Sequence, residues 1–240
     1  LHGVGASVVN ALSIFMSVEV IRSGIIYKQD FSMGLAITPL QNLGSTKKSN
    51  GTSITFKPDD KIFGDNNFFS PEKLFKILEY KAYLFGGVQI NWKCHASLIS
   101  ENSNIIDEKS LCYKNGLSEY IEFKTASIPM YIGSTFESKV NIDNELIEWA
   151  IRWFTQDELN FIESFCNTVP TTLGGTHELG FRQALLKGIK NFAEIKGFKK
   201  ANEFTYDDLM SSTGSILSIF IKEPQFQGQT KEKLVNTSIT

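Results

Sequence analysis

The sequence predicts an α+β protein with two domains. Segments with the patterning of strands and of helices alternate in both halves of the 240-residue chain. Hydrophobic residues make up 42% and charged residues 21%, as in globular proteins that bury a sizeable core. The character of the sequence changes near residues 125–129, which we take as a linker. We therefore expect one domain over residues 1–125 and a second over residues 126–240.

The first half is expected to begin with a short helix and a β-hairpin. Ser23-Gly24 separates two β-branched runs, which is typical of a tight turn between antiparallel strands. Ser70, Pro71 and Glu72 form a helix start, and the following apolar spacing is helical. The expected elements are a helix over 6–13, strands over 15–22, 25–31, 36–43 and 51–59 (the last half-buried and stopped by Pro58), a helix over 71–84, a strand over 88–93, a loop over 95–110 and a helix over 115–123.

The second half is expected to contain a sheet and a long helix. Its expected elements are strands over 130–138, 145–154, 161–168 and 214–222, and a helix over 176–196. In the strand over 145–154, large apolar residues stand at every second position. We expect the face that carries them to be buried: Ile147, Trp149, Ile151 and Trp153. On the long helix, the residues expected to face inward are Leu179, Ala184, Leu185, Ile189, Phe192 and Ala193.

Composition narrows the class of protein. The net charge of −2 and the pI near 6.0 offer no global attraction to nucleic acid. No apolar run reaches the ~20 residues of a membrane helix, and no secretory signal is visible. Cys94, Cys112 and Cys166 are odd in number and widely spaced, so we read them as reduced thiols and expect no metal site and a cytoplasmic protein without membrane contact.

The first residues of the chain resemble an anion-binding loop. Gly3 and Gly5 stand just before an apolar run, as in a loop that turns into a helix N-terminus. Glycines allow backbone N–H groups close to an anion, and a helix N-terminus adds unpaired donors. Ser7 is expected to cap the helix or to donate its hydroxyl to the same anion. The alternative is an ordinary tight turn.

Four stretches of sequence, in order, resemble the B subunit of bacterial type IIA DNA topoisomerases. Residues 1–13 are similar to the ATP lid of the GHKL ATPase fold, and Gly51-Thr52-Ser53 to its later Gly-Thr motif. Gly174-Gly175-Thr176-His177 is similar to the start of the transducer helix, and Gln229-Thr230-Lys231 to the loop that enters the ATP site. Within this family, Glu148-Trp149-Ala150 and residues 167–171 resemble topoisomerase IV more than gyrase.

The resemblance implies a fold for each domain. Residues 1–125 would form the C-terminal part of a GHKL (Bergerat) ATPase domain, and residues 126–240 a transducer domain like domain 2 of ribosomal protein S5. The complete protein would be an ATP-hydrolysing type II topoisomerase, an isomerase. ATP binding would dimerise two B subunits around DNA, and two topoisomerase A subunits would complete an A2B2 heterotetramer.

The resemblance also implies site residues. Lys231 would meet the γ-phosphate of ATP, with Gln229 beside it, and these two are the candidate catalytic residues. Thr52 would line the adenine end of the pocket, and Arg22 its outer mouth. The residues expected to bind the nucleotide are Leu1, His2, Gly3, Val4, Gly5, Ser7, Thr52, Gln229 and Lys231.

Each of these residues has a plainer alternative. Lys231 could be part of a solvated charged run with Lys233, and Thr52 and Arg22 could be ordinary strand residues. His177 is expected to be structural, bonded to a backbone carbonyl or a domain interface. For most of the basic residues that follow, solvated helix charge is favoured over contact with DNA: Arg182, Lys187, Lys190, Lys196, Lys199 and Lys200.

The resemblance places some functional groups outside this sequence. The family's catalytic glutamate, its Mg²⁺-binding asparagine and its adenine motif would precede residue 1. We therefore expect a piece of a longer protein that does not hydrolyse ATP by itself. The alternatives are the gyrase B subunit, an ATP-gated module of another GHKL protein such as a chaperone or mismatch-repair factor, and a non-enzymatic structural fragment.

Overall fold

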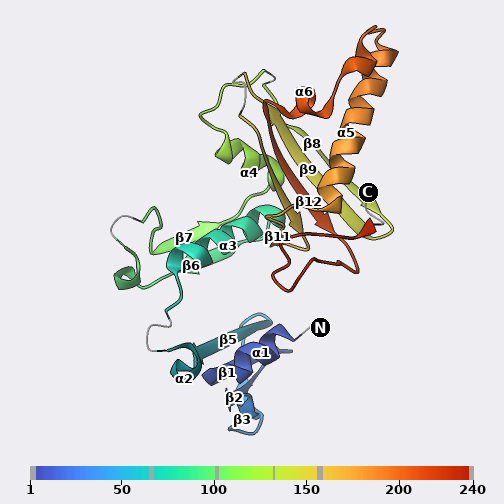
Figure 1. Ribbon diagram of the computed structural model, residues 1–240. Helices are drawn as coiled ribbons and strands as arrows, with labels where there is room; N and C mark the ends of the chain where they lie inside the picture. Colours follow the sequence, from blue (N-terminus) through green and yellow to red (C-terminus); the bar gives the residue numbers. More distant parts are fainter. Residues whose placement is uncertain (1–3, 65–67, 101–102, 132, 156–158, 238–240) are drawn as a thin grey trace. The chain divides into compact units, whose positions relative to one another are not determined.

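The computed structural model describes residues 4–64, 68–100, 103–131, 133–155 and 159–237, and its helices and strands are labelled in Figure 1. The chain divides into two compact units, Leu1–Ser70 and Pro71–Thr240. The boundary expected near residue 125 falls inside the second unit. The expected boundary divides the two domains that the family resemblance implies, whereas the two units are divided by their compactness. The domain boundary near residue 125 therefore stays a prediction.

The first unit is an antiparallel sheet with one helix packed near its end. The strand order is β3-β2-β1-β5, and β4 also pairs with β2. The predicted hairpin is confirmed, because Ser23 and Gly24 both have positive φ, 53° and 73°, and join paired strands. The elements are α1 (Gly5–Ala11), β1 (Ser13–Arg22), β2 (Ile25–Ser32), β3 (Leu35–Ala36), β4 (Gln41–Ser45), β5 (Gly51–Pro58) and α2 (Asp60–Phe63).

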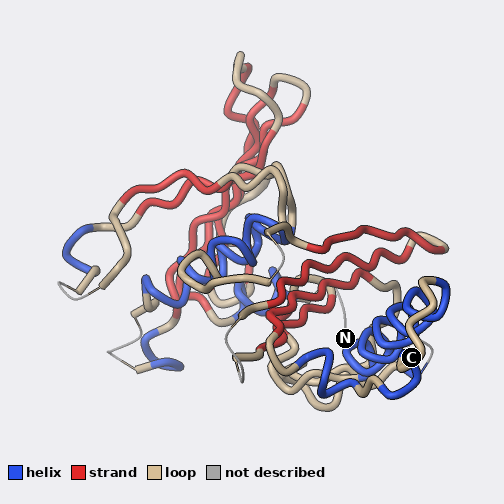
Figure 2. The backbone as a smooth tube through the Cα atoms, turned by 90° about the horizontal axis from the view of Figure 1, so that it is seen from above, coloured by secondary structure: helices blue, strands red, loops and turns tan. Residues whose placement is uncertain are grey.

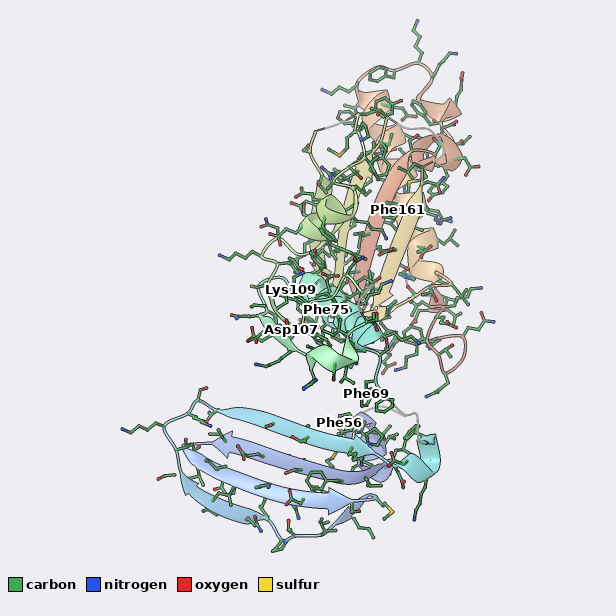
Figure 3. All side chains as sticks on the ribbon, turned by 90° about the vertical axis from the view of Figure 1, so that its left-hand side faces the viewer. Phe56, Phe69, Phe75, Asp107, Lys109 and Phe161 are labelled. Atoms are coloured by element: carbon green, nitrogen blue, oxygen red, sulfur yellow. The ribbon has the colours of Figure 1, made fainter. Side chains whose placement is uncertain are left out.

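Two expectations for the first unit are wrong. The single strand expected over 36–43 is two short strands, β3 and β4, which both pair with β2. Strand β5 was expected to be half-buried, yet the side chains of Ile54 and Phe56 are 51% and 39% exposed. Phe56 packs edge-to-face against Phe69, with ring centroids 5.8 Å apart (Figure 3). Much of the apolar surface of this sheet therefore remains uncovered within the described chain.

The second unit is built on a mixed sheet in the order β11-β10-β12-β9-β8. Strands β10 and β12 are parallel and joined through helix α5, while the other pairs are antiparallel. Strand β12 is central and buried along nearly all its length. The sheet strands are β8 (Phe136–Ile142), β9 (Glu145–Trp153), β10 (Phe161–Cys166), β11 (Val169–Pro170) and β12 (Thr213–Phe220).

Helices cover both faces of this sheet (Figure 2). On one face, Tyr83 of α3 (Pro71–Leu84) and Ile121 of α4 (Leu117–Lys124) pack with Ala150. On the other face, Phe181 of α5 (Thr176–Ile195) packs with the cluster that contains Leu217. Of the β9 residues expected to be buried, Ile151 is fully buried and Ile147, Trp149 and Trp153 are partly buried, while α3 and α4 also cover the second face of the strand.

Helix α5 occupies the predicted range but does not seal the sheet. Of the residues expected to face inward, Leu179 is 49% and Phe192 60% exposed. A largely apolar cavity of about 710 Å³ lies between α5 and the sheet, lined by Trp149 and Phe181 among others. The residues of α5 that line this cavity run along the helix from His177 to Phe192.

Smaller elements complete the second unit. The loop expected over 95–110 contains the start of a strand, β7 (Glu108–Leu111), which pairs with β6 (Ile90–Lys93). The strand expected from residue 130 begins only at Phe136. The remaining elements are η1 (Ala96–Leu98), η2 (Ala201–Glu203) and α6 (Tyr206–Met210).

Among the described residues, no helix is both long and apolar enough to cross a membrane. The three cysteines are free, as expected, and Cys166 is buried.

Candidate nucleotide site

The glycine-containing start of the chain leads into helix α1. Leu1, His2 and Gly3 lie outside the described residues. Val4 directly precedes the helix and accepts a backbone hydrogen bond from Val8, and the helix begins at Gly5. Of the two roles expected for Ser7, the helix cap is wrong, because Ser7 lies inside α1 and the helix has no side-chain cap. The Ser7 side chain is exposed, so its hydroxyl remains open to a ligand.

Packing within the chain does not explain the glycine at position 5. Among the described residues, no atom lies within 4 Å of where a Cβ at Gly5 would stand. Its φ is also outside the left-handed region that favours glycine. A ligand that approaches this backbone closely would account for the missing side chain.

Thr52 and Arg22 share one face of the first sheet. Thr52 on β5 lies directly opposite Val20 on β1, and Arg22 follows Val20 by two residues on the same strand. Side chains directly opposite, and two apart, point to the same side of a sheet. This face also carries Ile54 and Phe56, so both expected nucleotide contacts border an uncovered apolar surface.

Gln229 and Lys231 lie at the turn of a long loop in the second unit. Gln229 is exposed, and Lys231 adopts a left-handed backbone conformation with φ of 60°. A non-glycine residue in this conformation is strained and is often found at functional sites. Within the part of the chain that the structure describes, the Lys231 ammonium has no ion-pair partner. It is therefore available to an anion.

The base of this loop is hydrogen-bonded to the start of helix α5. Leu234 exchanges backbone hydrogen bonds with Gly174 and Thr176. The Gly-Gly-Thr-His segment and the Gln-Thr-Lys loop, which are far apart in the sequence, are thus neighbours in the fold. The expected nucleotide residues otherwise divide between the units: Val4, Gly5, Ser7 and Thr52 in the first, and Gln229 and Lys231 in the second.

His177 is buried and bonded to a side chain. Its Nε2 lies 3.0 Å from the Thr171 hydroxyl and not from a backbone carbonyl, which was one of the two partners expected. The side chain is 2% exposed, and burial lowers the pKa of the imidazole to about 4. His177 is therefore neutral near pH 7.

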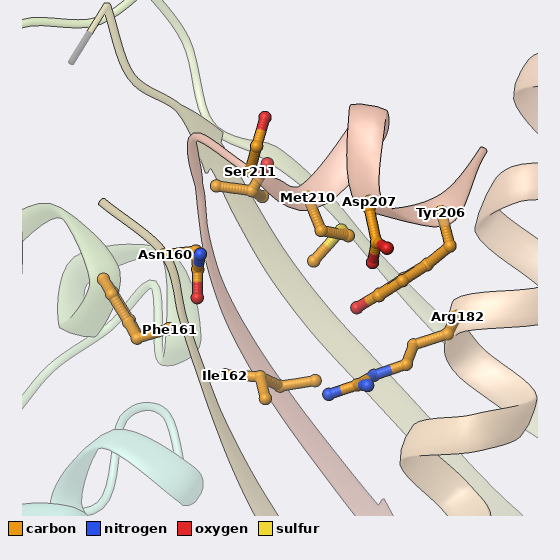
Figure 4. Close-up of a pocket in the computed structure, with 9 residues that line it drawn as sticks. Asn160, Phe161, Ile162, Arg182, Tyr206, Asp207, Met210 and Ser211 are labelled. Carbon is orange, nitrogen blue, oxygen red and sulfur yellow. The ribbon is translucent and has the colours of Figure 1, made fainter. Parts of the chain in front are cut away.

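Arg182 is tied into the fold rather than free on the helix surface. It points from α5 into a cavity of about 360 Å³ beside Ile162 (Figure 4), with its guanidinium 5.0 Å from the Tyr206 ring centroid. It also pairs with Glu178 one helical turn earlier, at 3.6 Å. Solvated helix charge, the favoured expectation, does not describe this residue.

A buried polar cluster beside the loop base was missed in the sequence. The Ser164 hydroxyl on β10 lies within hydrogen-bonding distance of Thr171 and Glu178, at 2.5 and 2.6 Å. Asn167 exchanges two hydrogen bonds with the backbone of Ile221. No local pattern singles out Ser164, which follows Glu163 in β10, and the partners of Asn167 lie too far away in sequence to be inferred.

Acidic and thiol groups are scattered through the structure. Among the described residues, no group of three or more His, Cys, Asp or Glu side chains could hold a metal ion.

Known proteins have this fold. The ATPase domain of Thermus thermophilus gyrase B, in complex with an aminocoumarin, superposes with a TM-score of 0.83 at 30% identity and covers 99% of this chain and 62% of its own. The ATP-binding domain of Francisella tularensis topoisomerase IV, with a small-molecule inhibitor, gives a TM-score of 0.78 at 28% identity, covering 99% of this chain and 62% of its own. The fold is that of the GHKL class of ATPases.

Comparison by sequence narrows the class to one family. The family model described as DNA gyrase B matches residues 116–240. The chain belongs to the DNA gyrase B family. The topoisomerase 4 B subunit of Bartonella bacilliformis is 45% identical over 99% of this chain and 34% of its own length. The corresponding protein of Caulobacter vibrioides is 44% identical over 98% of this chain and 34% of its own.

These comparisons confirm the resemblance to topoisomerase B subunits and the α+β fold class. The chain spans about a third of the length of these two curated relatives. The chaperone and mismatch-repair alternatives are excluded by the family match.

Proposed function

We propose that residues 1–240 form the ATP-lid and transducer part of the B subunit of an ATP-dependent type II DNA topoisomerase, of the topoisomerase IV kind. The two relatives found by sequence, both topoisomerase 4 B subunits, support topoisomerase IV over gyrase. The observation that carries the site is Lys231, a strained lysine without an ion pair among the described residues, at the turn of an anchored loop. Residues 126–240 would be the transducer domain, and residues 1–125 the end of the ATPase domain.

The residues present fit a nucleoside triphosphate. The open space at Gly5 admits a phosphate close to the backbone, and the N–H groups from Gly3 to Gly5 would donate to its oxygens. Leu1, His2, Val4 and Ser7 would surround the same phosphates, and Thr52 would lie at the adenine end. ATP would supply the phosphoanhydride bond whose hydrolysis resets the protein.

Lys231 and Gln229 would distinguish triphosphate from diphosphate. Lysine is a compact positive charge on a long stem, suited to neutralising a terminal phosphate. Gln229 would donate to the same phosphate or orient the attacking water. Because only a triphosphate extends far enough to reach Lys231, this contact would couple the nucleotide state to the second unit.

The partners follow from the proposed class. DNA would be the substrate, a second copy of the B subunit would dimerise with this one when nucleotide is bound, and two topoisomerase A subunits would complete an A2B2 heterotetramer. Mg²⁺ would be held by residues outside this chain. We place the protein in the cytoplasm, since its proposed substrate is chromosomal DNA.

Binding of a non-hydrolysable ATP analogue and of ADP to the complete gene product tests the role of Lys231. Lys231→Ala is expected to weaken analogue binding about 10- to 100-fold, because a charged hydrogen bond is lost, and to leave ADP binding unchanged. Lys233→Ala is the matched control, because the Lys233 side chain is exposed. The backbone carbonyl of Lys233, which the substitution keeps, accepts a hydrogen bond from the backbone N–H of Gln227. Equal analogue affinities for the two variants would contradict the proposal.

A further inference from the structure

The loop that carries Lys231, residues 223–236, is closed at its own base. We call it the lysine loop. Asn236, which is 8% exposed, accepts from the backbone N–H of Gln225 at 2.7 Å and donates to the carbonyl of Glu223 at 2.9 Å. Gln227 and Val235 add backbone hydrogen bonds across the loop. The two arms therefore form one short, closed hairpin.

The returning arm of the lysine loop is hydrogen-bonded to the turn that leads into α5, residues 171–176, which we call the corner. Leu173 donates to the carbonyl of Glu232, Leu234 donates to that of Gly174, and Thr176 donates to that of Leu234, at 2.9 to 3.1 Å. The Leu234 side chain is fully buried in the core cluster with Leu217. The loop base is thus attached to the helix by its backbone and to the sheet by its side chain.

This attachment requires glycine at position 175. Gly175 has φ of 148°, and a Cβ there would lie 2.3 Å from the Leu234 carbonyl oxygen and 2.7 Å from its nitrogen. These are backbone atoms, which cannot rotate away as the end of a flexible side chain can. Any side chain at this position must displace the strand of the loop that it pairs with.

A buried polar cluster of Ser164, Thr171, His177 and Glu178 connects the same corner to strand β10. Thr171, which is 3% exposed, donates its backbone N–H to the carbonyl of Ser164, and its hydroxyl contacts both Ser164 and His177. Glu178 accepts from the Ser164 hydroxyl. The cluster thereby links β10, the corner and the first turn of α5.

We infer that Gly175 and Thr171 are positioning residues for Lys231. They set the base of the lysine loop, so that its turn presents Lys231 at a fixed place relative to α5 and the sheet. This inference rests on the proposed function for its consequence in catalysis, but the attachment itself does not depend on nucleotide. The two parts can be tested separately.

Trypsin tests the attachment in the 240-residue chain without nucleotide. The bond after Lys233 is expected to be protected in the native protein, because Leu234 on its far side is buried and hydrogen-bonded. Gly175→Ala is expected to speed cleavage there at least about 10-fold relative to cleavage after Lys48, which lies in the first unit. Gly188→Ala in α5, where no described atom lies within 4 Å of a Cβ, is the matched control and should not raise the ratio.

A second pair of variants keeps the test open if Gly175→Ala does not fold. Thr171→Val removes the hydroxyl at nearly constant volume and is expected to raise the same cleavage ratio, whereas Thr171→Ser should restore protection. Unchanged protection in both Gly175→Ala and Thr171→Val would overturn the attachment.

ATP turnover by the complete gene product tests the positioning role. Gly175→Ala is expected to lower kcat about 10-fold with little change in KM, and the Gly175→Ala/Lys231→Ala double variant should turn over no more slowly than Lys231→Ala alone. If Lys231→Ala alone has no effect, the proposed function fails. If Lys231→Ala lowers kcat but Gly175→Ala does not, or if the two losses multiply, the positioning inference fails.

Discussion

His177 shows how burial alters the chemistry of one side chain. The sequence places His177 at a helix start that follows two glycines, which favours a structural role but does not identify its partner. In the structure it has the Thr171 hydroxyl as partner, and the pKa of its imidazole lies near 4 instead of 6.5 because water is excluded. Such a group is neutral and is suited to holding the corner before α5 rather than to exchanging protons near pH 7.

The stability of the second unit should therefore depend on pH through His177. The unfolded chain takes up this proton below pH 6.5 and the folded chain only near pH 4. The contribution is fully present above pH 6.5 and is lost as the pH falls towards 4, up to about 3 kcal/mol. His177→Asn is expected to flatten the dependence over this range.

Urea unfolding at several pH values, followed by tryptophan fluorescence, measures this effect. Trp92, Trp149 and Trp153 all lie in the second unit, so the signal reports that unit alone. When the unfolding free energy of the variant is subtracted from that of the native protein at each pH, the contributions of the titratable groups that both proteins share cancel. A difference that does not change between pH 7 and 5 would exclude the role of His177.

Strand β12 and helix α5 differ in how tightly their neighbours pack. The central strand is buried almost throughout, and at Gly214 a Cβ would stand 2.7 Å from the Phe161 ring and 2.8 Å from that of Phe154. Helix α5 stands over a large apolar cavity, and Gly188 on it has open space. The same substitution should therefore have opposite effects in the two elements.

Gly214→Ala is expected to destabilise the second unit by about 1–3 kcal/mol, since aromatic rings must move. Gly188→Ala is expected to stabilise it by about 1 kcal/mol, because alanine favours a helix interior. Tryptophan-detected urea unfolding of the two variants compares them directly. Destabilisation by Gly188→Ala would show that α5 packs more closely on the sheet than its cavity indicates.

The chain as a whole carries the groups proposed to sense nucleotide but not those that would activate water. The family resemblance places the catalytic glutamate and the Mg²⁺ ligand outside residues 1–240, and no three-residue metal cluster occurs among those described. Purified residues 1–240 are therefore expected to show no steady Mg²⁺-dependent ATP turnover. A phosphate-release assay measures this, and turnover that survives Lys231→Ala would point to a contaminating ATPase.

The complete gene product with its A-type partner is expected to separate linked DNA circles in an ATP-dependent reaction. Gel analysis of catenated and relaxed circular DNA distinguishes the two paralogues, because gyrase would introduce negative supercoils into the relaxed circle. Lys231→Ala should abolish either activity, while Lys233→Ala should not. Efficient negative supercoiling by the native protein would assign it to the gyrase kind.

The sequence alone was sufficient for the α+β class, the hairpin at Ser23-Gly24, helices α3 and α5, and the family. These depend on local signals: turn residues, helix starts, periodicity and short motifs. Its errors came where distant segments meet. The pairing of β7 with β6 and the exposure of Leu179 and Phe192 depend on which elements pack together, and local patterning does not encode that.

The candidate site divides in the same way. The sequence by itself identified Gly5, Thr52, Gln229 and Lys231 as candidates, because their motifs are contiguous. Only the tertiary structure showed that Gly175 leaves room for the Leu234 backbone, and that Ser164 and Thr171 hold the corner beside it. A hydrogen bond between residues far apart in the chain leaves no periodic trace in a sequence, since it arises only when β10, α5 and the lysine loop pack around a shared core.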